Sequence, residues 1–118
     1  MDKSIEISLL FDFYSKLLSD KKRTAAQLYF NDDLSLSEVA EHMGITRQGV
    51  SDLIRRTESE LYDFEDKLGI YSRFEAINKS AERIRTLSES IINDDSAEVK
   101  LLAREISKEA AKIEQLEA

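Results

Sequence analysis

The sequence predicts an all-α fold in which a helical bundle with a helix-turn-helix precedes a C-terminal helical hairpin. Three observations support this. The 118 residues include no proline and three glycines, so helix breakers are rare. No segment shows the period-2 alternation of apolar and polar residues that is typical of strands. Apolar residues instead recur at spacings of three and four along most of the chain, as in amphipathic helices.

The first two predicted helices form the N-terminal part of the bundle. The first covers about Ser4 to Leu18 and holds more apolar residues than one face can carry, so neighbouring helices or a second subunit must cover it. Ser19 or Asp20 can cap the second helix, which runs to about Phe30. The turn-forming run 31–33, Asn-Asp-Asp, ends it.

The next two helices are predicted from capping residues. Ser35 can cap a short third helix, and Glu38 three positions later completes a possible capping box. That helix ends at Gly44. Thr46 can cap a long fourth helix, for which Gly69 is a natural C-cap.

The third and fourth helices together meet the requirements of a helix-turn-helix. The steep crossing needs a small residue, which Ala40 supplies, and the sharp turn favours a glycine with positive φ, which Gly44 supplies. The shared core needs apolar residues at set spacing, and these are Val39, Met43, Ile45, Val50 and Leu53. We therefore expect a helix-turn-helix domain over residues 1–69.

A second domain, residues 70–118, is expected to be a helical hairpin for dimerisation or docking. One apolar stripe comprises Phe74, Ile77, Ala81, Ile84 and Ile91, and the other comprises Val99, Leu102, Ala103, Ile106, Ala110, Ile113 and Leu116. The run 93–96, Asn-Asp-Asp-Ser, separates them, and Ser96 can cap the last helix. A lone hairpin buries little apolar surface, so its stripes must pack on the first four helices or on another copy of the chain.

The candidate nucleic-acid-binding residues lie on the outer face of the motif's second helix. That face exposes Thr46, Arg47, Gln48, Ser51, Asp52 and Arg55. Arginine can bind guanine through two hydrogen bonds, glutamine can bind adenine, and serine can contact bases or phosphate. Arg55 and Arg56 lie farther along the helix and suit backbone contacts.

Lys21, Lys22 and Arg23 form a basic cluster that could clamp a flanking phosphate. The alternative, for this cluster and for the helix face, is an ordinary solvated surface.

The net charge argues against tight DNA binding. The chain carries −7 with a pI near 4.8. Residues 1–69 hold nine Lys or Arg against fourteen Asp or Glu, and residues 70–118 hold eight against ten. Such a monomer gains little from counterion release, so DNA binding should be weak, or need two subunits or a partner.

Other classes of chemistry find little support, and we expect no enzyme, cofactor or metal. The absence of cysteine excludes thiol catalysis and cysteine-based metal sites, and the one histidine, His42, is expected at the surface. The pairs Asp32-Asp33 and Asp94-Asp95 lack the spacing of a calcium loop. No run of about 18 apolar residues and no secretory signal occurs, so we expect a cytoplasmic protein.

The sequence resembles two known families, one over part of the chain and one over nearly all of it. Residues 21–61, with Ala25-Ala26-Gln27-Leu28-Tyr29-Phe30 and Leu34-Ser35-Leu36-Ser37-Glu38-Val39-Ala40, resemble region 4 of bacterial σ factors. Nearly the whole chain is similar to the YlxM family of small helix-turn-helix proteins. The similarity includes Leu10-Phe11-Asp12-Phe13-Tyr14, the central motif, Leu61-Tyr62-Asp63-Phe64-Glu65 and Leu68-Gly69.

The resemblance to the YlxM family implies a role rather than a reaction. Genes of that family characteristically lie beside those for the signal recognition particle GTPase and its receptor, so members are supposed to act in, or regulate, that targeting pathway. Their DNA binding is inferred from the motif, and no catalytic residues come with it. The residues before the motif include nothing suited to melting promoter DNA or holding polymerase, so we do not expect a complete σ factor.

Three hypotheses follow. The first is a DNA-binding regulatory homodimer that uses Thr46, Arg47, Gln48, Ser51 and Arg55. The second is an adaptor of the same fold that binds signal recognition particle protein or RNA. The third is a σ-like modulator that contacts RNA polymerase.

Overall fold

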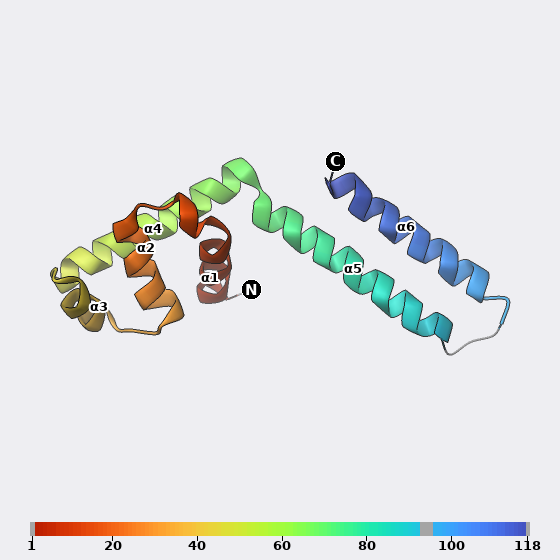
Figure 1. Cartoon of the computed structure of the whole chain (residues 1–118), viewed down its shortest axis with the longest axis horizontal. Coiled ribbons are helices and arrows are strands. Elements are labelled where there is room, and N and C mark those ends of the chain that lie inside the picture. Colours follow the sequence, from red (N-terminus) through yellow and green to blue (C-terminus); the bar gives the residue numbers. More distant parts are fainter. Residues whose placement is uncertain (1, 93–95, 118) are drawn as a thin grey trace. The chain divides into compact units, whose positions relative to one another are not determined.

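The computed structural model describes residues 2–92 and 96–117, and over these ranges it contains helices and no strand. The predicted all-α class is therefore confirmed. The chain divides into two compact units, Met1–Tyr71 and Ser72–Ala118. Figure 1 shows the helices of each unit along the chain. The predicted turn residues 93–95, with the pair Asp94-Asp95, lie outside the described residues.

The first unit contains four α-helices. They are α1 (Lys3–Tyr14), α2 (Asp20–Ala26), α3 (Leu36–Met43) and α4 (Arg47–Leu68). A 3₁₀ turn (Ser15–Leu17) follows α1, and a π-helical turn (Gln27–Asn31) follows α2. The first helix is thus shorter than predicted, because the chain tightens at Ser15 and turns into an extended Leu18.

The predicted caps of this unit are confirmed. The hydroxyl oxygens of Ser19, Ser35 and Thr46 accept hydrogen bonds from backbone N–H groups in the first turns of α2, α3 and α4. Gly69 closes α4 with a φ of 63°, the left-handed conformation for which glycine is suited.

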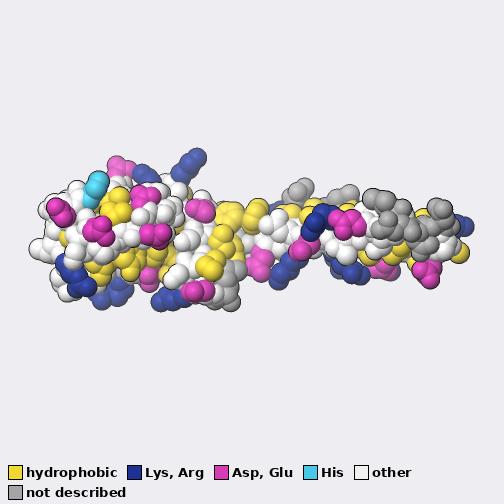
Figure 2. All heavy atoms as spheres, turned by 90° about the horizontal axis from the view of Figure 1, so that it is seen from below, with side chains coloured by type: hydrophobic (Ala, Val, Ile, Leu, Met, Phe, Trp, Pro, Cys, Tyr) yellow, Lys and Arg dark blue, Asp and Glu magenta, His cyan; other side chains and the backbone are white. Residues whose placement is uncertain are grey.

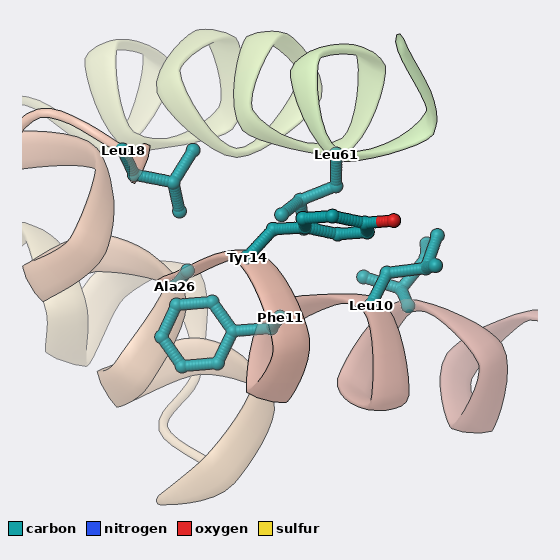
Figure 3. Packing of buried hydrophobic residues seen from close by; sticks show 7 residues of the cluster. Leu10, Phe11, Tyr14, Leu18, Ala26 and Leu61 are labelled. Atoms are coloured by element: carbon teal, nitrogen blue, oxygen red, sulfur yellow. The ribbon is translucent and has the colours of Figure 1, made fainter. Parts of the chain in front are cut away.

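One of the two cores of this unit surrounds Tyr14. Its buried members are Ile7, Leu10, Phe11, Tyr14, Leu18, Ala26 and Leu61. Figure 3 shows Tyr14 of α1 lying against Leu61 of α4. Helices of the same chain therefore cover most of the crowded apolar surface of α1, although Ile5 remains 54% exposed.

Tyr14 also joins three segments by hydrogen bonds at the end of α4. Its hydroxyl donates to Glu65 Oε1 at 2.6 Å and accepts from the Ile70 N–H at 3.0 Å. Glu65 Oε1 accepts in addition from the Tyr71 N–H at 3.0 Å. Burial of the ring, and then the hydrogen bond to Glu65, raise the pKa of Tyr14.

The second unit is a pair of helices, α5 (Ile70–Ile92) and α6 (Val99–Glu117). They run side by side in opposite directions, as the hairpin prediction requires (Figure 1). On α5, Ser80 and Leu87 are buried, and Ile77, Ile84 and Ile91 are half-buried. On α6, the half-buried side chains are Val99, Leu102, Glu105, Ile106, Glu109, Ala110 and Ile113.

Details of the hairpin differ from the prediction. Ala81 and Ala103 are exposed, and Phe74 is 46% exposed, whereas Leu87 and Ser80 occupy the inner face of α5. The helical period explains this, because positions 77, 80, 84, 87 and 91 share the spacing of three and four that the expected stripe also showed. Ser96 acts at the start of α6 as predicted: its hydroxyl oxygen accepts from the Glu98 N–H at 3.3 Å and its carbonyl from the Val99 N–H at 3.1 Å, although the regular α-helix begins only at Val99.

No helix in the described part of the chain is both long and apolar enough to cross a membrane.

Candidate nucleic-acid interface

The helix-turn-helix is formed by α3 and α4, and its turn depends on Gly44. Gly44 has a φ of 68°, as the sequence predicted, and no atom lies within 4 Å of where a Cβ would stand. The turn is closed by a hydrogen bond from the Ile45 N–H to the Ala40 carbonyl at 3.1 Å. The positive φ, rather than close packing, is therefore what favours glycine here.

The start of α4 depends on a second glycine. The Gly49 N–H donates to Thr46 Oγ1 at 3.0 Å, and a Cβ at position 49 would stand 3.1 Å from that oxygen. Such a Cβ would crowd the cap. The signal for Gly49 in the sequence is its place three residues after a threonine N-cap, where the backbone N–H donates to the cap.

A capping box fixes the start of α3. The Ser35 hydroxyl oxygen accepts from the Glu38 N–H at 3.1 Å, and Glu38 Oε1 accepts from the Ser35 N–H at 3.0 Å. The hydrogen bonds from the Ser35 backbone and side chain lower the pKa of Glu38. The predicted capping box is confirmed.

The second core of the first unit lies beneath the motif. Its buried members are Ala25, Val39, Ala40, Val50 and Ile54, and Met43, Ile45 and Leu53 pack against it half-buried. All the apolar residues predicted for the motif thus contribute. Because α2 adds Ala25 to this core, the motif is held on a third helix and not only by its own turn.

The residues predicted to contact DNA lie along the first half of α4. Arg47, Gln48 and Arg55 are exposed, and Ser51 is half-buried. Thr46 is exposed as well, but its Oγ1 already accepts the capping hydrogen bond. The structure therefore places this set on one helix, with Arg47 and Gln48 in its first turn.

Asp52 lies between two of these residues and contacts both. Its Oδ1 accepts from Gln48 Nε2 at 3.3 Å and from Arg55 Nη2 at 2.7 Å. Asp52 was predicted on this face, but no contact was predicted for it. The spacings of four to Gln48 and three to Arg55 are the signal that could have indicated these contacts.

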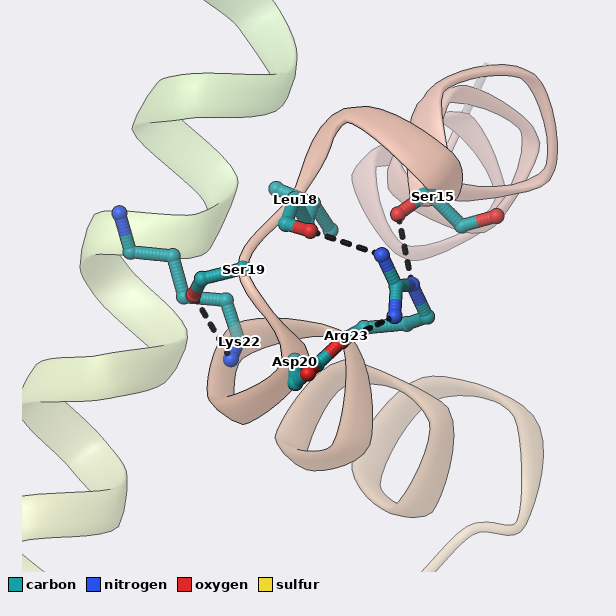
Figure 4. A network of polar contacts seen from close by, with 6 residues as sticks. All are labelled: Ser15, Leu18, Ser19, Asp20, Lys22 and Arg23. Atoms are coloured by element: carbon teal, nitrogen blue, oxygen red, sulfur yellow. Dashed lines mark hydrogen bonds and ion pairs between the residues drawn. The ribbon is translucent and has the colours of Figure 1, made fainter.

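Two residues of the basic cluster, Lys22 and Arg23, have different partners within the chain. Lys22 pairs with Glu60 of α4. Arg23 donates to the Ser15 carbonyl at 3.0 Å, the Leu18 carbonyl at 2.8 Å and Asp20 Oδ1 at 2.8 Å (Figure 4). Arg23 thereby supplies a donor to the Leu18 carbonyl and a second donor to the Ser15 carbonyl, which already accepts from the Leu18 N–H at 3.1 Å.

Lys21 is exposed and lines a hollow of about 240 Å³ beside the motif. The other residues lining it are Ile45, Gly49, Asp52, Leu53 and Arg56. Lys21 and Arg56 thus lie at one hollow next to the start of α4, whereas Lys22 and Arg23 have partners within the chain. The cluster does not form the single clamp expected from its sequence.

The charge of α4 changes sign along the helix. Residues 46–56 contain three arginines and one aspartate, and residues 57–68 contain one lysine and five acidic residues. Figure 2 shows side chains of both signs on the surface of the first unit. The net charge of the whole chain therefore hides a cationic segment, and this segment coincides with the positive end of the helix dipole.

Comparison with known proteins agrees with this architecture. The sequence profile of the family described as "Putative helix-turn-helix protein, YlxM / p13 like" matches residues 1–112. A UPF0122 protein of Limosilactobacillus reuteri (strain DSM 20016) is 42% identical over 96 residues, which is 81% of this chain and 85% of that protein. A UPF0122 protein of Halalkalibacterium halodurans is 40% identical over 98 residues, covering 83% and 87% of the two chains.

Proposed function

The chain belongs to the YlxM/p13-like family of helix-turn-helix proteins, and we propose that it is a regulatory protein that binds DNA through the first half of α4. The observation that carries this proposal is the cationic, exposed first half of α4 within a complete helix-turn-helix. A helix of this kind enters the major groove with its N-terminal residues at the base edges.

The first turn of α4 supplies the contacts to bases. Arg47 and Gln48 are exposed there, and each can form two hydrogen bonds to one base, Arg47 to guanine and Gln48 to adenine. Ser51 and Arg55 follow on the same face. Thr46 contributes mainly by capping the helix, because its hydroxyl oxygen accepts the Gly49 N–H.

Lys21 and Arg56 supply contacts to the phosphate backbone. Both line the hollow beside the start of α4, so a phosphate next to the groove would meet two cations there, with the Asp52 carboxylate as the one opposing charge among the lining residues. Lys22 and Arg23 are less suited, because a phosphate would have to compete with Glu60, Asp20 and backbone carbonyls for them.

We further propose that the active form is a homodimer held by the second unit. Among the described residues of this two-helix unit, one apolar side chain, Leu87, is buried. Phe74 and Leu101 are 46% and 61% exposed. A pair of helices with so small a core gains too little from burial to be stable alone. A second copy of the same hairpin would complete a four-helix arrangement and would also double the number of DNA-binding faces.

Binding assays on a selected duplex test the proposal. In vitro selection from random duplexes at low salt should enrich one sequence. Arg47→Ala should weaken binding to that sequence by about 1–3 kcal/mol and change binding to random duplex little. Lys21→Ala should weaken both equally and reduce the salt dependence by about one counterion. Selection that enriches no sequence would contradict DNA recognition.

A second candidate is an adaptor that binds a protein or RNA of the signal recognition particle. The acidic second half of α4 favours it, because five acidic residues against one lysine suit a basic partner better than a nucleic acid. Capture of the particle's protein from nuclease-treated lysate, unchanged by Arg47→Ala, would support this role. Binding to RNA polymerase in the same experiment would support a σ-like modulator instead.

A further inference from the structure

The carboxylate of Asp52 stands in the middle of the proposed DNA-binding face. Gln48 Nε2 and Arg55 Nη2 both donate to its Oδ1, at 3.3 Å and 2.7 Å. The three side chains form one row along α4, and the Asp52 side chain is still 38% exposed. The row therefore presents an acceptor, flanked by two donors, to whatever contacts this face.

A carboxylate on this face is unfavourable for binding DNA in general. Phosphates repel it, and its ion pair with Arg55 offsets one of the cations that would otherwise attract the duplex. In a random sequence no particular base is placed to offset this loss of affinity. The loss is reduced only where a base donates a hydrogen bond to the carboxylate.

The major groove offers few such donors. They are the exocyclic amino groups, N4 of cytosine and N6 of adenine, and aspartate characteristically accepts from cytosine N4. Adenine also presents the N7 acceptor next to its amino group, which suits an amide better than a carboxylate. A cytosine therefore fits Asp52 better than an adenine does.

We propose that Asp52 determines specificity by accepting a hydrogen bond from the N4 amino group of a cytosine and by disfavouring sequences that lack it. This inference rests on the DNA binding proposed above. Asp52 also acts on its neighbours, because its hydrogen bonds hold Gln48 and Arg55 in fixed positions along the groove. Selectivity is thereby gained at the expense of affinity for random DNA.

Selection from random duplexes with three proteins tests this inference. The wild type should enrich a C·G pair at one position. Asp52→Asn should enrich an A·T pair there, since asparagine binds adenine N6 and N7 together, and should bind random duplex about tenfold more tightly at low salt. Asp52→Ala should show the same gain for random duplex and no base preference at that position.

Asp63→Asn is the matched control. It removes the same charge from the same helix, and Asp63 likewise pairs with a neighbour, Lys67, at 2.9 Å. It lies eleven residues, or about 16 Å, farther along α4, beyond the Debye length of about 8 Å at physiological salt. Asp63→Asn should keep the wild-type base preference. Thermal melts of all variants should match the wild type.

The outcomes separate the two proposals. If the wild type enriches a sequence and Asp52→Asn enriches the same one, with no more gain for random duplex than Asp63→Asn, then Asp52 is a structural ion-pair partner only. The inference is then wrong and DNA binding stands. If the wild type enriches no sequence, DNA recognition fails and the role of Asp52 fails with it.

Discussion

At the scale of single residues, two positions of the helix-turn-helix are constrained for different reasons, one by its backbone conformation and the other by the size of its side chain. Gly44 serves through its backbone alone, since no neighbour would contact a Cβ there. Ala40 serves through its small size, because it is 7% exposed in the core shared by α3 and α4. The two positions therefore tolerate different substitutions.

Gly44→Val should destabilise the fold by about 1–2 kcal/mol, because a β-branched residue is strained at a φ of 68°. Gly44→Asn should cost less, since asparagine tolerates this conformation. Urea unfolding monitored by circular dichroism measures both. Equal midpoints for the wild type and Gly44→Val would contradict the role given to Gly44.

Ala40→Leu should cost about 1–3 kcal/mol for a different reason, which is over-packing of the helix crossing. Glu41→Leu, at the next and exposed position of α3, is the control. A leucine at position 40 that melts like the leucine at position 41 would argue against a close crossing of α3 and α4.

At the scale of elements, hydrogen bonds at helix ends decide where each helix begins and what it is joined to. The capping box of α3 and the hydrogen bonds around Tyr14 are the two clearest cases. Each includes a group with a shifted pKa, Glu38 in the capping box and Tyr14 at the end of α4, so each should contribute to the pH dependence of stability.

Ser35→Ala should destabilise the protein at neutral pH by about 1 kcal/mol through loss of the α3 cap. The lowered pKa of Glu38 means that the wild-type box stabilises above the ordinary glutamate pKa of about 4.3, and that this stabilisation is lost as pH falls through the folded value. Unfolding at pH 7 and pH 3 should therefore show a smaller difference between variant and wild type at pH 3. Ser37→Ala, exposed on the same helix, should behave like the wild type at both.

Tyr14→Phe should cost about 1–3 kcal/mol, because it leaves the Ile70 N–H without its acceptor and Glu65 without one donor. Exchange of the Ile70 amide hydrogen should become faster. Since the pKa of Tyr14 is raised, its hydroxyl stabilises the fold below the ordinary tyrosine pKa of about 10, and this is lost as pH rises through the folded value. The variant should lose the part of the alkaline pH dependence of stability that comes from Tyr14. An unchanged exchange rate of the Ile70 amide would contradict the hydrogen bond to the Tyr14 hydroxyl.

At the scale of the whole molecule, net charge is a poor guide to where the protein binds. The chain carries −7, yet the first half of α4 carries an excess of arginine and the second half an excess of acid. The proposed dimer also belongs to this scale, because the second unit buries so little apolar surface that we expect two copies of it to associate.

Leu101→Gln should weaken the proposed dimer, because Leu101 is 61% exposed on α6 and a second copy of the hairpin would cover it. Arg85→Gln, at an exposed position of α5, removes only the surface ion pairs to Glu82 and Glu89 and should leave the dimer intact. Sedimentation velocity at micromolar concentration distinguishes them. A wild-type protein that sediments as a monomer would exclude dimerisation through this unit.

The sequence by itself determined the helical fold, the helix-turn-helix and the caps at Ser19, Ser35, Thr46 and Gly69. These features follow from local rules, since capping, positive φ at glycine and helical period depend on residues a few positions apart. Local rules did not suffice to predict which residues of α5 face inward in the hairpin. Two stripes of α5 shared the spacing of three and four, and contact with α6 decided that Leu87 and Ser80, not Ala81, lie inward.

In the basic cluster, the tertiary structure decided which side chains find partners in other segments of the chain. Lys21, Lys22 and Arg23 are equivalent as a sequence run, but the turn after α1 brings two carbonyls to Arg23, and α4 brings Glu60 to Lys22. Lys21 is left beside Arg56 at the start of the motif. Long flexible side chains pair with whatever the fold brings within reach, so the choice among them depends on contacts between segments far apart in the chain.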